Sequence, residues 1–141
     1  MDTQTQALSP AAKTALPATK KKVLIVEDDL ATNKFLGVRL RSLDFEVITA
    51  YDGEAGLKEA RRHHPNLIIL DLKLPKMIGE EVCKAIREDH DKTFALTPII
   101  MLSGKNSDVD RVVGTVIGAN CYVTKPFRIE SILKEIHKFN L

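Results

Sequence analysis

Acidic side chains follow two separate apolar runs of the 141-residue chain. The acids Glu27–Asp29 come directly after Val23–Val26, and Asp71 comes directly after Leu67–Leu70. Burying an unpaired carboxylate costs roughly 2 kcal/mol or more, so an acid at the end of such a run needs a reason to be there. Gathered carboxylates raise one another's proton affinity unless a cation lies among them. A hard divalent cation is the simplest remedy, and Mg²⁺ favours carboxylates, waters and phosphate oxygens.

A hydroxyl and a lysine follow two further apolar runs. Ser103 comes after Ile99–Leu102, and Lys125 comes after Cys121–Thr124. A phosphoryl group needs metal and ammonium groups for its charge and a donor for its oxygens. A carboxylate can itself attack phosphorus and form an aspartyl phosphate. The set therefore predicts a site at which Asp71 accepts a phosphoryl group.

Alternating strands and helices would bring these residues together. Short continuous apolar runs predict five strands, at Val23–Val26, Phe45–Ala50, Leu67–Leu70, Ile99–Leu102 and Cys121–Thr124. Residues at helical spacing, all apolar except Arg61, predict five helices. They are Leu36, Leu40 and Leu43; Leu57, Ala60 and Arg61; Val82 and Ile86; Val109, Val112, Val113, Val116 and Ile117; and Ile129, Ile132, Leu133 and Ile136. Strands without alternation are typical of a parallel sheet covered on both faces. We therefore expect a doubly wound α/β domain whose ligand crevice lies at the carboxyl ends of the strands.

Size and composition indicate one folded domain over residues 21–141. Residues 1–20 are rich in Thr, Ala, Gln and Pro with little periodicity, and we interpret them as a flexible arm. The net charge of +2 falls to about −1 without the first 22 residues, which argues against a nucleic-acid-binding surface. Cys83 and Cys121 show no metal-binding pattern and are expected to be reduced thiols. Apolar runs far shorter than the roughly 20 residues of a membrane helix, with no signal peptide, predict a cytoplasmic protein.

Four motifs, in order, resemble the receiver domains of two-component response regulators. They are VLIVEDD at Val23–Asp29, LIILDLKLP at Leu67–Pro75, PIIMLSG at Pro98–Gly104 and GANCYVTKPF at Gly118–Phe127. The resemblance covers essentially all of residues 22–141 and is closest to the chemotaxis type that stands alone. It implies a flavodoxin-like receiver fold with a five-stranded parallel sheet in the order 2-1-3-4-5.

The resemblance also implies a role for each site residue. Asp71 would be the phosphoacceptor, and Mg²⁺ would be held by Asp71, Glu27, Asp28 and the backbone carbonyl of Lys73. Ser103 and Lys125 would contact phosphoryl oxygens, and Tyr122 would swing inward as Ser103 moves. The bond between Lys125 and Pro126 would be cis.

The resemblance implies that the protein is a signalling switch and not an enzyme. It would catalyse only its own phosphorylation and its own slow dephosphorylation. The phosphodonor would be a sensor histidine kinase or a histidine phosphotransfer protein. The signal would leave through the fourth helix, the fifth strand and the fifth helix to a downstream protein target, without direct nucleic-acid or membrane binding. A phosphorylation-dependent dimer is left open, and so is the choice between a stand-alone regulator and a receiver from a larger protein. The alternative is a receiver-like interaction module that is not phosphorylated.

Several residues also have simpler interpretations. Asp29 suits the start of a helix, where acids favour the dipole, so it is left out of the site. Tyr122 fits a plain strand aromatic as well as a switch. Ser103 could cap the fourth helix, but the box at Ser107–Asp110 is a closer candidate. The poor helix propensity of that helix, which contains Gly114 and Thr115, leads to the hypothesis that it shifts readily.

Two departures from the family pattern stand out. Ile78 replaces the usual Asp or Asn before the glycine of the turn after Asp71. Lys73 and Lys105 occupy variable positions that would flank hydrolytic water, and we hypothesise that they slow dephosphorylation. Other classes on similar sheets fit less well: EDDLATN after Val26 is neither GxGxxG nor GxxxxGK, and the position two after Asp71 is a lysine, unlike the DxD of aspartyl-phosphate phosphatases.

Overall fold

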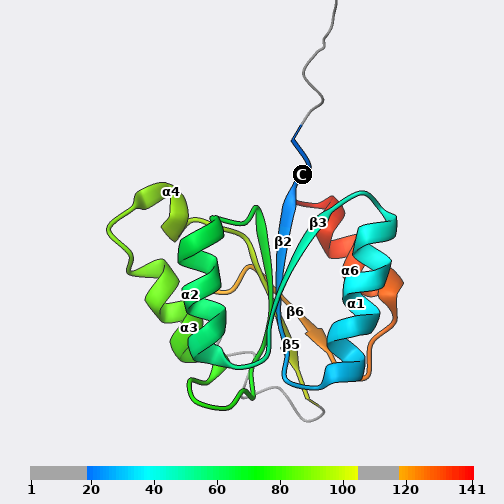
Figure 1. Ribbon diagram of the computed structural model, residues 1–141, viewed down its shortest axis with the longest axis horizontal. Helices are drawn as coiled ribbons and strands as arrows, with labels where there is room; N and C mark the ends of the chain where they lie inside the picture. Colours follow the sequence, from blue (N-terminus) through cyan, green and yellow to red (C-terminus); the bar gives the residue numbers. More distant parts are fainter. Residues whose placement is uncertain (1–18, 105–117) are drawn as a thin grey trace, which may run out of the picture.

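The computed structural model describes residues 19–104 and 118–141 (Figure 1). Its strands are β2 (Lys22–Val26), β3 (Glu46–Ala50), β4 (Leu67–Asp71), β5 (Ile99–Ser103) and β6 (Cys121–Thr124). Its helices are α1 (Leu30–Ser42), α2 (Gly53–His63), α3 (Gly79–Arg87), α4 (Lys92–Ala95) and α6 (Ile129–His137). From β2 to α3 strands and helices alternate along the chain as the apolar pattern predicts, and α4 then follows α3 directly.

The five strands form one parallel sheet in the order β3-β2-β4-β5-β6. Counted along the chain this is 2-1-3-4-5, so the predicted doubly wound order is confirmed. The order reverses next to β2, because the chain moves outward to β3 and then crosses back to β4 on the other side. Parallel strands point the same way, so the loops after β2, β4, β5 and β6 meet at one edge of the sheet.

Helices cover both faces of the sheet. In Figure 1, α2, α3 and α4 lie on one side of it and α1 and α6 on the other. Side chains alternate between the two layers along each strand: Leu24 and Val26 pack toward α2 and α3, whereas Val23 and Ile25 pack toward α1 and α6. Every residue of β4 and β5 is buried. The uninterrupted apolar runs are therefore explained by a core on each face.

Aspartates cap the first two helices. Asp29 accepts a hydrogen bond from the backbone N–H of Thr32 at the start of α1, at 3.0 Å. Asp52 accepts one from Ala55 N at 2.7 Å at the start of α2. Both caps satisfy donors that a helix leaves unpaired at its first turn. The interpretation of Asp29 as a helix-start residue is confirmed.

The observed elements differ from the expected ones in a few places. Asp71 and Ser103 are the last residues of β4 and β5 and do not lie after them. Leu43, expected on the core face of the first helix, is its C-cap and is 47% exposed. The helix α4 was not expected, because four residues capped by Asp91 are too short to show a helical period. The fourth expected helix, with Lys105 and Ser107–Asp110, lies outside the described residues, as does most of the predicted arm.

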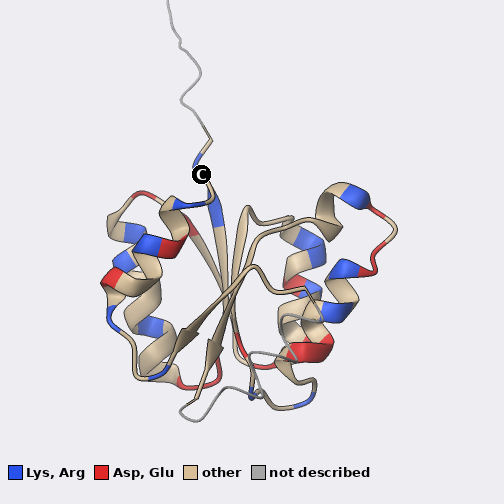
Figure 2. Cartoon of the chain, turned by 180° about the vertical axis from the view of Figure 1, so that it is seen from behind, with Lys and Arg blue, Asp and Glu red and all other residues tan. Residues whose placement is uncertain are grey.

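Charge is mixed over the surface of the domain. Figure 2 shows Lys and Arg interspersed with Asp and Glu on helices on both sides of the sheet. Neither sign gathers on one face in the part of the chain that the structure describes. Among the described helices none is long and apolar enough to cross a bilayer. Cys83 and Cys121 are both thiols, as expected.

Candidate functional site

The carboxyl ends of four strands bring the predicted site residues together. Glu27 and Asp28 follow β2, and Asp71 and Ser103 end β4 and β5. Lys125 follows β6, and its backbone N–H donates to the carbonyl of Ser103 at 2.6 Å. The sheet thus assembles residues that are almost a hundred positions apart in the chain.

Three carboxylates converge at this edge. Glu27, Asp28 and Asp71 each offer an oxygen within 4.8 Å of the others. Glu27 is fully buried, Asp71 is 6% exposed and Asp28 is exposed. Mg²⁺ binds carboxylate oxygens and usually keeps several of its water ligands, so it needs only a few oxygens from the protein. The donor set therefore fits a hard divalent cation.

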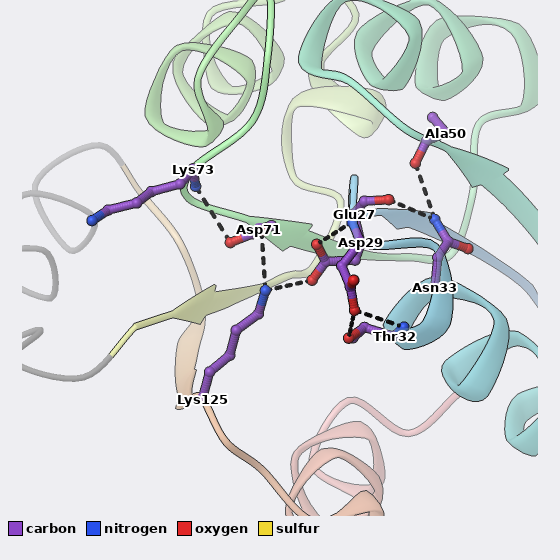
Figure 3. A network of polar contacts seen from close by, with 8 residues as sticks. All are labelled: Glu27, Asp29, Thr32, Asn33, Ala50, Asp71, Lys73 and Lys125. Carbon is purple, nitrogen blue, oxygen red and sulfur yellow. Dashed lines mark hydrogen bonds and ion pairs between the residues drawn. The ribbon is translucent and has the colours of Figure 1, made fainter.

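Lys125 lies between two of these acids (Figure 3). Its Nζ is 2.6 Å from Glu27 Oε1 and 3.1 Å from Asp71 Oδ2. Burial raises the pKa of Glu27, and the contact with Lys125 only partly opposes this. Burial alone would lower the pKa of Lys125, but its contacts with Glu27 and Asp71 outweigh burial and raise it. The lysine is thus held as a cation beside Asp71, and the bond from Lys125 to Pro126 is cis.

The hydroxyl of Ser103 is buried without a partner among the described residues. Ser103 is 0% exposed, and its Oγ makes no hydrogen bond to that part of the chain. A buried polar atom without a partner costs about 1–3 kcal/mol, so a fold that keeps one points to a ligand or a second state. Tyr122, the second residue of β6, is half-buried with its ring against the α2 and α3 layer and its phenolic oxygen buried.

The loop after β4 places Lys73 on the other side of Asp71. The backbone N–H of Lys73 donates to Asp71 Oδ1 at 3.3 Å, and its side chain points away from the acids (Figure 3). Its carbonyl as a metal ligand stays a prediction. Ile78 is the N-cap of α3, without a side-chain cap, and is 46% exposed. The departure from the family pattern thus costs α3 its capping side chain.

Asn33 is a site residue that sequence reasoning missed. It is 1% exposed, and its Nδ2 donates to the carbonyls of Glu27 at 2.9 Å and Ala50 at 3.2 Å. It therefore fixes the loop that carries Glu27 against the end of β3 (Figure 3). The available signal was an Asn in the middle of a helical segment, where its propensity is poor and a buried hydrogen bond is the usual reason for it.

An apolar groove opens beside Lys125. It has a volume of about 580 Å³ and is lined by Ala31, Thr32, Phe35, Lys125, Pro126 and Phe127. The side chains of Leu30 and Phe35 on α1 are 68% and 46% exposed. Large exposed apolar side chains next to a reactive centre are typical of a protein-docking surface.

The doubly wound fold, with three carboxylates and a lysine gathered at the carboxyl ends of its strands, agrees with the comparisons with known proteins. Residues 23–137 match the family described as the response regulator receiver domain. The chain belongs to this family.

Curated relatives include regulatory proteins of two bacteria. The chain is 40% identical over 121 residues to the alkaline phosphatase synthesis transcriptional regulatory protein PhoP of Bacillus subtilis, covering 81% of this chain and 49% of PhoP. It is 42% identical over 115 residues to the response regulator ArlR of Staphylococcus aureus, covering 82% of this chain and 50% of ArlR. The chain therefore spans about half the length of these relatives. Because PhoP is named a transcriptional regulator, the expectation of no nucleic-acid partner is not borne out.

Solved structures of receiver domains superpose closely. The chemotaxis response regulator CheY4 of Vibrio cholerae matches with a TM-score of 0.78 and 33% identity over 86% of this chain and 99% of that one. The receiver domain of the sensor histidine kinase PA1611 of Pseudomonas aeruginosa matches with a TM-score of 0.77 and 26% identity, over 86% and 98%. The PA1611 receiver domain has a magnesium ion coordinated in its active-site cleft. The flavodoxin-like receiver fold is thus confirmed.

Proposed function

We propose that the chain is a phosphorylation-dependent signalling switch in which Asp71 accepts a phosphoryl group from a phosphohistidine of a kinase or phosphotransfer protein. One observation carries the proposal: the oxygens of Glu27, Asp28 and Asp71 converge within 4.8 Å while Lys125 Nζ lies 3.1 Å from Asp71. Such a cluster combines a nucleophile, a cation site and a fixed positive charge. A passive interaction module has no need for this arrangement.

In the transfer, an oxygen of Asp71 attacks phosphorus and forms an O–P bond as the N–P bond to the donor imidazole breaks. The electron pair of the broken bond stays on the leaving imidazole nitrogen. Lys125 neutralises charge on the phosphoryl oxygens, as ammonium groups do in phosphoryl transfer. Ser103 Oγ, buried without a partner among the described residues, supplies the hydrogen bond that a phosphoryl oxygen accepts.

Glu27, Asp28 and Asp71 are the side chains that would hold Mg²⁺, together with the carbonyl of Lys73. When bound, the ion screens the acids from one another and from the incoming phosphoryl oxygens. The magnesium in the cleft of the related PA1611 receiver domain supports this assignment. Asp29 is not among the proposed metal ligands, because its carboxylate accepts a hydrogen bond from the backbone N–H of Thr32 at the start of α1.

The apolar groove beside Lys125 suits the phosphodonor protein. A phosphohistidine must approach Asp71 from solvent, and Lys125 lines both the site and the groove. Exposed Phe35 would then be covered by the donor. On the output side, movement of Ser103 and Tyr122 would carry the signal along β6 and α6 to a downstream protein. The fourth predicted helix belongs to this route but lies outside the described residues.

The proposed domain boundaries follow the sequence pattern. Residues 21–141 form the receiver domain in this proposal, preceded by the arm at residues 1–20. The match covers about half of each named relative, and PhoP is named a transcriptional regulatory protein. A cytoplasmic location and a phosphorylation-dependent dimer stay predictions.

The domain would act on itself alone, by accepting and slowly losing its own phosphoryl group. Lys73 is two residues after the acceptor, and its ammonium could hold off or reorder hydrolytic water. Together with Lys105 it is proposed to slow the loss. Exchange of Lys73 for Ala would leave the decay rate unchanged if this idea is wrong.

The test is incubation with acetyl phosphate and Mg²⁺, followed by intact mass measurement. Wild-type protein is expected to gain one phosphoryl group, and Asp71→Asn is expected to gain none. Asp91→Asn is the matched control, because Asp91 caps α4 at the far end of the sheet and should leave the adduct unchanged. A wild-type protein without an Asp71-dependent adduct would favour the interaction module that is not phosphorylated.

A further inference from the structure

The strand that precedes Lys125 has a pairing partner on one side only. β6 has four residues and is an edge strand paired only with β5. Side chains alternate faces along a strand, so a slip by one residue would turn every side chain of β6 to the opposite face. Lys125, which directly follows β6, would then lose its place between Glu27 and Asp71. The register of β6 is therefore a condition for the site.

A side chain fixes this register at the start of the strand. Asn120 N donates to the carbonyl of Ile99 at 2.9 Å, and Ile99 N donates to Asn120 Oδ1 at 2.8 Å. We call this pair of bonds an asparagine bracket. A second bracket joins Asn66 and Lys22, with both bonds at 2.8 Å, at the start of β4. The two brackets differ in their setting, because β4 is paired on both sides by β2 and β5.

Only the bracket of β6 is anchored by an arginine within the described residues. Arg87 ends α3, and its Nη2 donates to Asn120 Oδ1 at 2.8 Å. Its Nε donates to the carbonyl of Gly118 at 2.8 Å. Its Nη1 donates to the carbonyls of Ala95 at 2.9 Å and Thr97 at 2.8 Å. The planar guanidinium thus joins α3, the residues before β5 and the residues before β6.

The backbone at Gly118 is shaped to meet this arginine. Gly118 has a φ of +100°, which a side chain would strain. A Cβ at this position would lie 3.1 Å from Arg87 Cγ and 3.2 Å from Arg87 Nε. The chain therefore lies directly against the arginine side chain. The acceptors of Arg87 named above are all neutral oxygens, so the interaction serves to hold backbone and not to pair charge.

We propose that Arg87 and Asn120 are positioning residues that hold β6 in register and thereby keep Lys125 Nζ between Glu27 and Asp71. The inference rests on the proposed phosphoryl transfer to Asp71. Neither residue touches the reacting atoms. Both act through Lys125: Asn120 precedes β6 and Lys125 follows it, and Arg87 acts through its bond to Asn120.

Mg²⁺ affinity separates this role from a general effect on the fold. The side chains proposed to hold the ion lie just after β2 and at the end of β4, and these two strands do not pair with β6. A displaced Lys125 removes a positive charge from beside those acids. Loss of the bracket should therefore slow phosphorylation without weakening Mg²⁺ binding, whereas partial unfolding would impair both.

The experiment compares Asn120→Ala and Arg87→Met with the matched control Asn66→Ala. Asn120 is exposed, so its truncation leaves the core intact. At saturating Mg²⁺, the initial rate of phosphorylation by acetyl phosphate is expected to fall by about tenfold in both variants, as small misplacements of catalytic groups do. Asn66→Ala is expected to keep the wild-type rate, because two neighbours fix β4. Asn120→Asp, which retains the accepting oxygen, is expected to restore most of the rate.

Thermal unfolding and Mg²⁺ titration of each variant complete the test. If Arg87→Met does not fold, the Asn120 variants decide. Wild-type rates in folded Asn120→Ala, or an equal loss of rate in Asn66→Ala, would overturn the positioning role. An Mg²⁺ affinity that falls together with the rate would do the same. A wild-type protein that forms no Asp71 adduct would instead overturn the proposed function on which the inference rests.

Discussion

Glu27 and Lys125 explain how a folded protein tolerates a cluster of acids. Glu27 is 0% exposed, and a buried carboxylate without a partner costs several kcal/mol. Lys125 compensates both Glu27 and Asp71, at 2.6 Å and 3.1 Å. Removal of Lys125 would leave the buried carboxylates of Glu27 and Asp71 without the cation between them. The residue that prepares the phosphoryl site therefore also stabilises the fold.

Ser103 shows the opposite relation between stability and function. Its buried hydroxyl makes no hydrogen bond within the described residues. We predict that Ser103→Ala is at least as stable as wild type, with a free energy of unfolding higher by up to about 1 kcal/mol, because no bond is lost and a desolvated polar atom is removed. Phosphorylation by acetyl phosphate should slow by about tenfold or more, because one donor to the phosphoryl oxygens is missing. Urea unfolding and mass-based rates measure the two effects.

Thr97→Val is the matched control for Ser103→Ala. The hydroxyl of Thr97 is also buried, but it donates to the carbonyl of Phe94 at 2.7 Å. Its removal should lower the free energy of unfolding by about 1 kcal/mol and leave the phosphorylation rate unchanged. A Ser103→Ala variant that is destabilised as much as Thr97→Val would mean that the serine hydroxyl has a partner in solution.

Among single residues, the sequence predicted the candidate site residues and missed the residues that position them. Asp71, Glu27 and Lys125 were found because each follows an apolar run, which is a local pattern. Asn33 and Arg87 were not, because their partners lie 17 and up to 33 positions away and nothing local marks the contact. The cost of leaving buried carbonyls unpaired explains these bonds only once the fold is known.

Among the elements, α3 begins in close contact with the end of β4. Gly79 begins α3, and its N–H donates to the carbonyl of Leu72 at 2.8 Å. A Cβ on Gly79 would lie 2.3 Å from the carbonyl oxygen of Asp71 and 2.8 Å from Leu72 Cα. Both atoms are backbone and cannot turn aside. The glycine therefore sets how closely α3 approaches the end of β4.

We predict that Gly79→Ala lowers the free energy of unfolding by about 1–3 kcal/mol, because the loop must shift to relieve the clash. The shift moves Lys73, whose carbonyl is a proposed ligand, so Mg²⁺ affinity should also fall. Urea unfolding and Mg²⁺ titration measure these changes. In the control Gly37→Ala, the nearest atom is Arg41 Nη1 at 3.2 Å, the end of a flexible side chain, so stability should be kept or raised by up to about 1 kcal/mol. Equal behaviour of the two variants would show that the approach of α3 is not constrained.

The elements themselves were largely predictable, and the exceptions have physical causes. The five strands were found to within one residue at each end because two covered faces demand uninterrupted apolar runs. The helix α4 escaped because its stability comes from the Asp91 cap and from tertiary contacts of Phe94, not from a repeating face. Leu43 was misplaced because its spacing continues the pattern of α1 one residue past the helix end.

For the whole molecule, the distribution of charge separates the surface from the site. Acids and bases are interspersed on helices on both sides of the sheet (Figure 2), so the described surface carries little long-range field. The acids at the carboxyl ends of the strands are not interspersed with bases in this way. Three carboxylates converge there, and among the described residues one lysine compensates them. Their mutual repulsion opposes folding, and a cation that relieves it must stabilise the entire domain by linkage.

We therefore predict that Mg²⁺ raises the unfolding temperature of the wild-type chain. At about one hundred times its Kd, an ion that binds only the folded state adds roughly 2.7 kcal/mol to the free energy of unfolding. Asp28→Asn should lose most of this response, because it removes one of the converging oxygens without disturbing the core. Asp91→Asn removes an acid at the far end of the sheet. Mg²⁺ should raise the unfolding temperature of this variant, measured against the same variant without Mg²⁺, as much as it does in wild type. A wild-type protein indifferent to Mg²⁺, or an equal loss of response in both variants, would mean that the three carboxylates do not form a specific cation site.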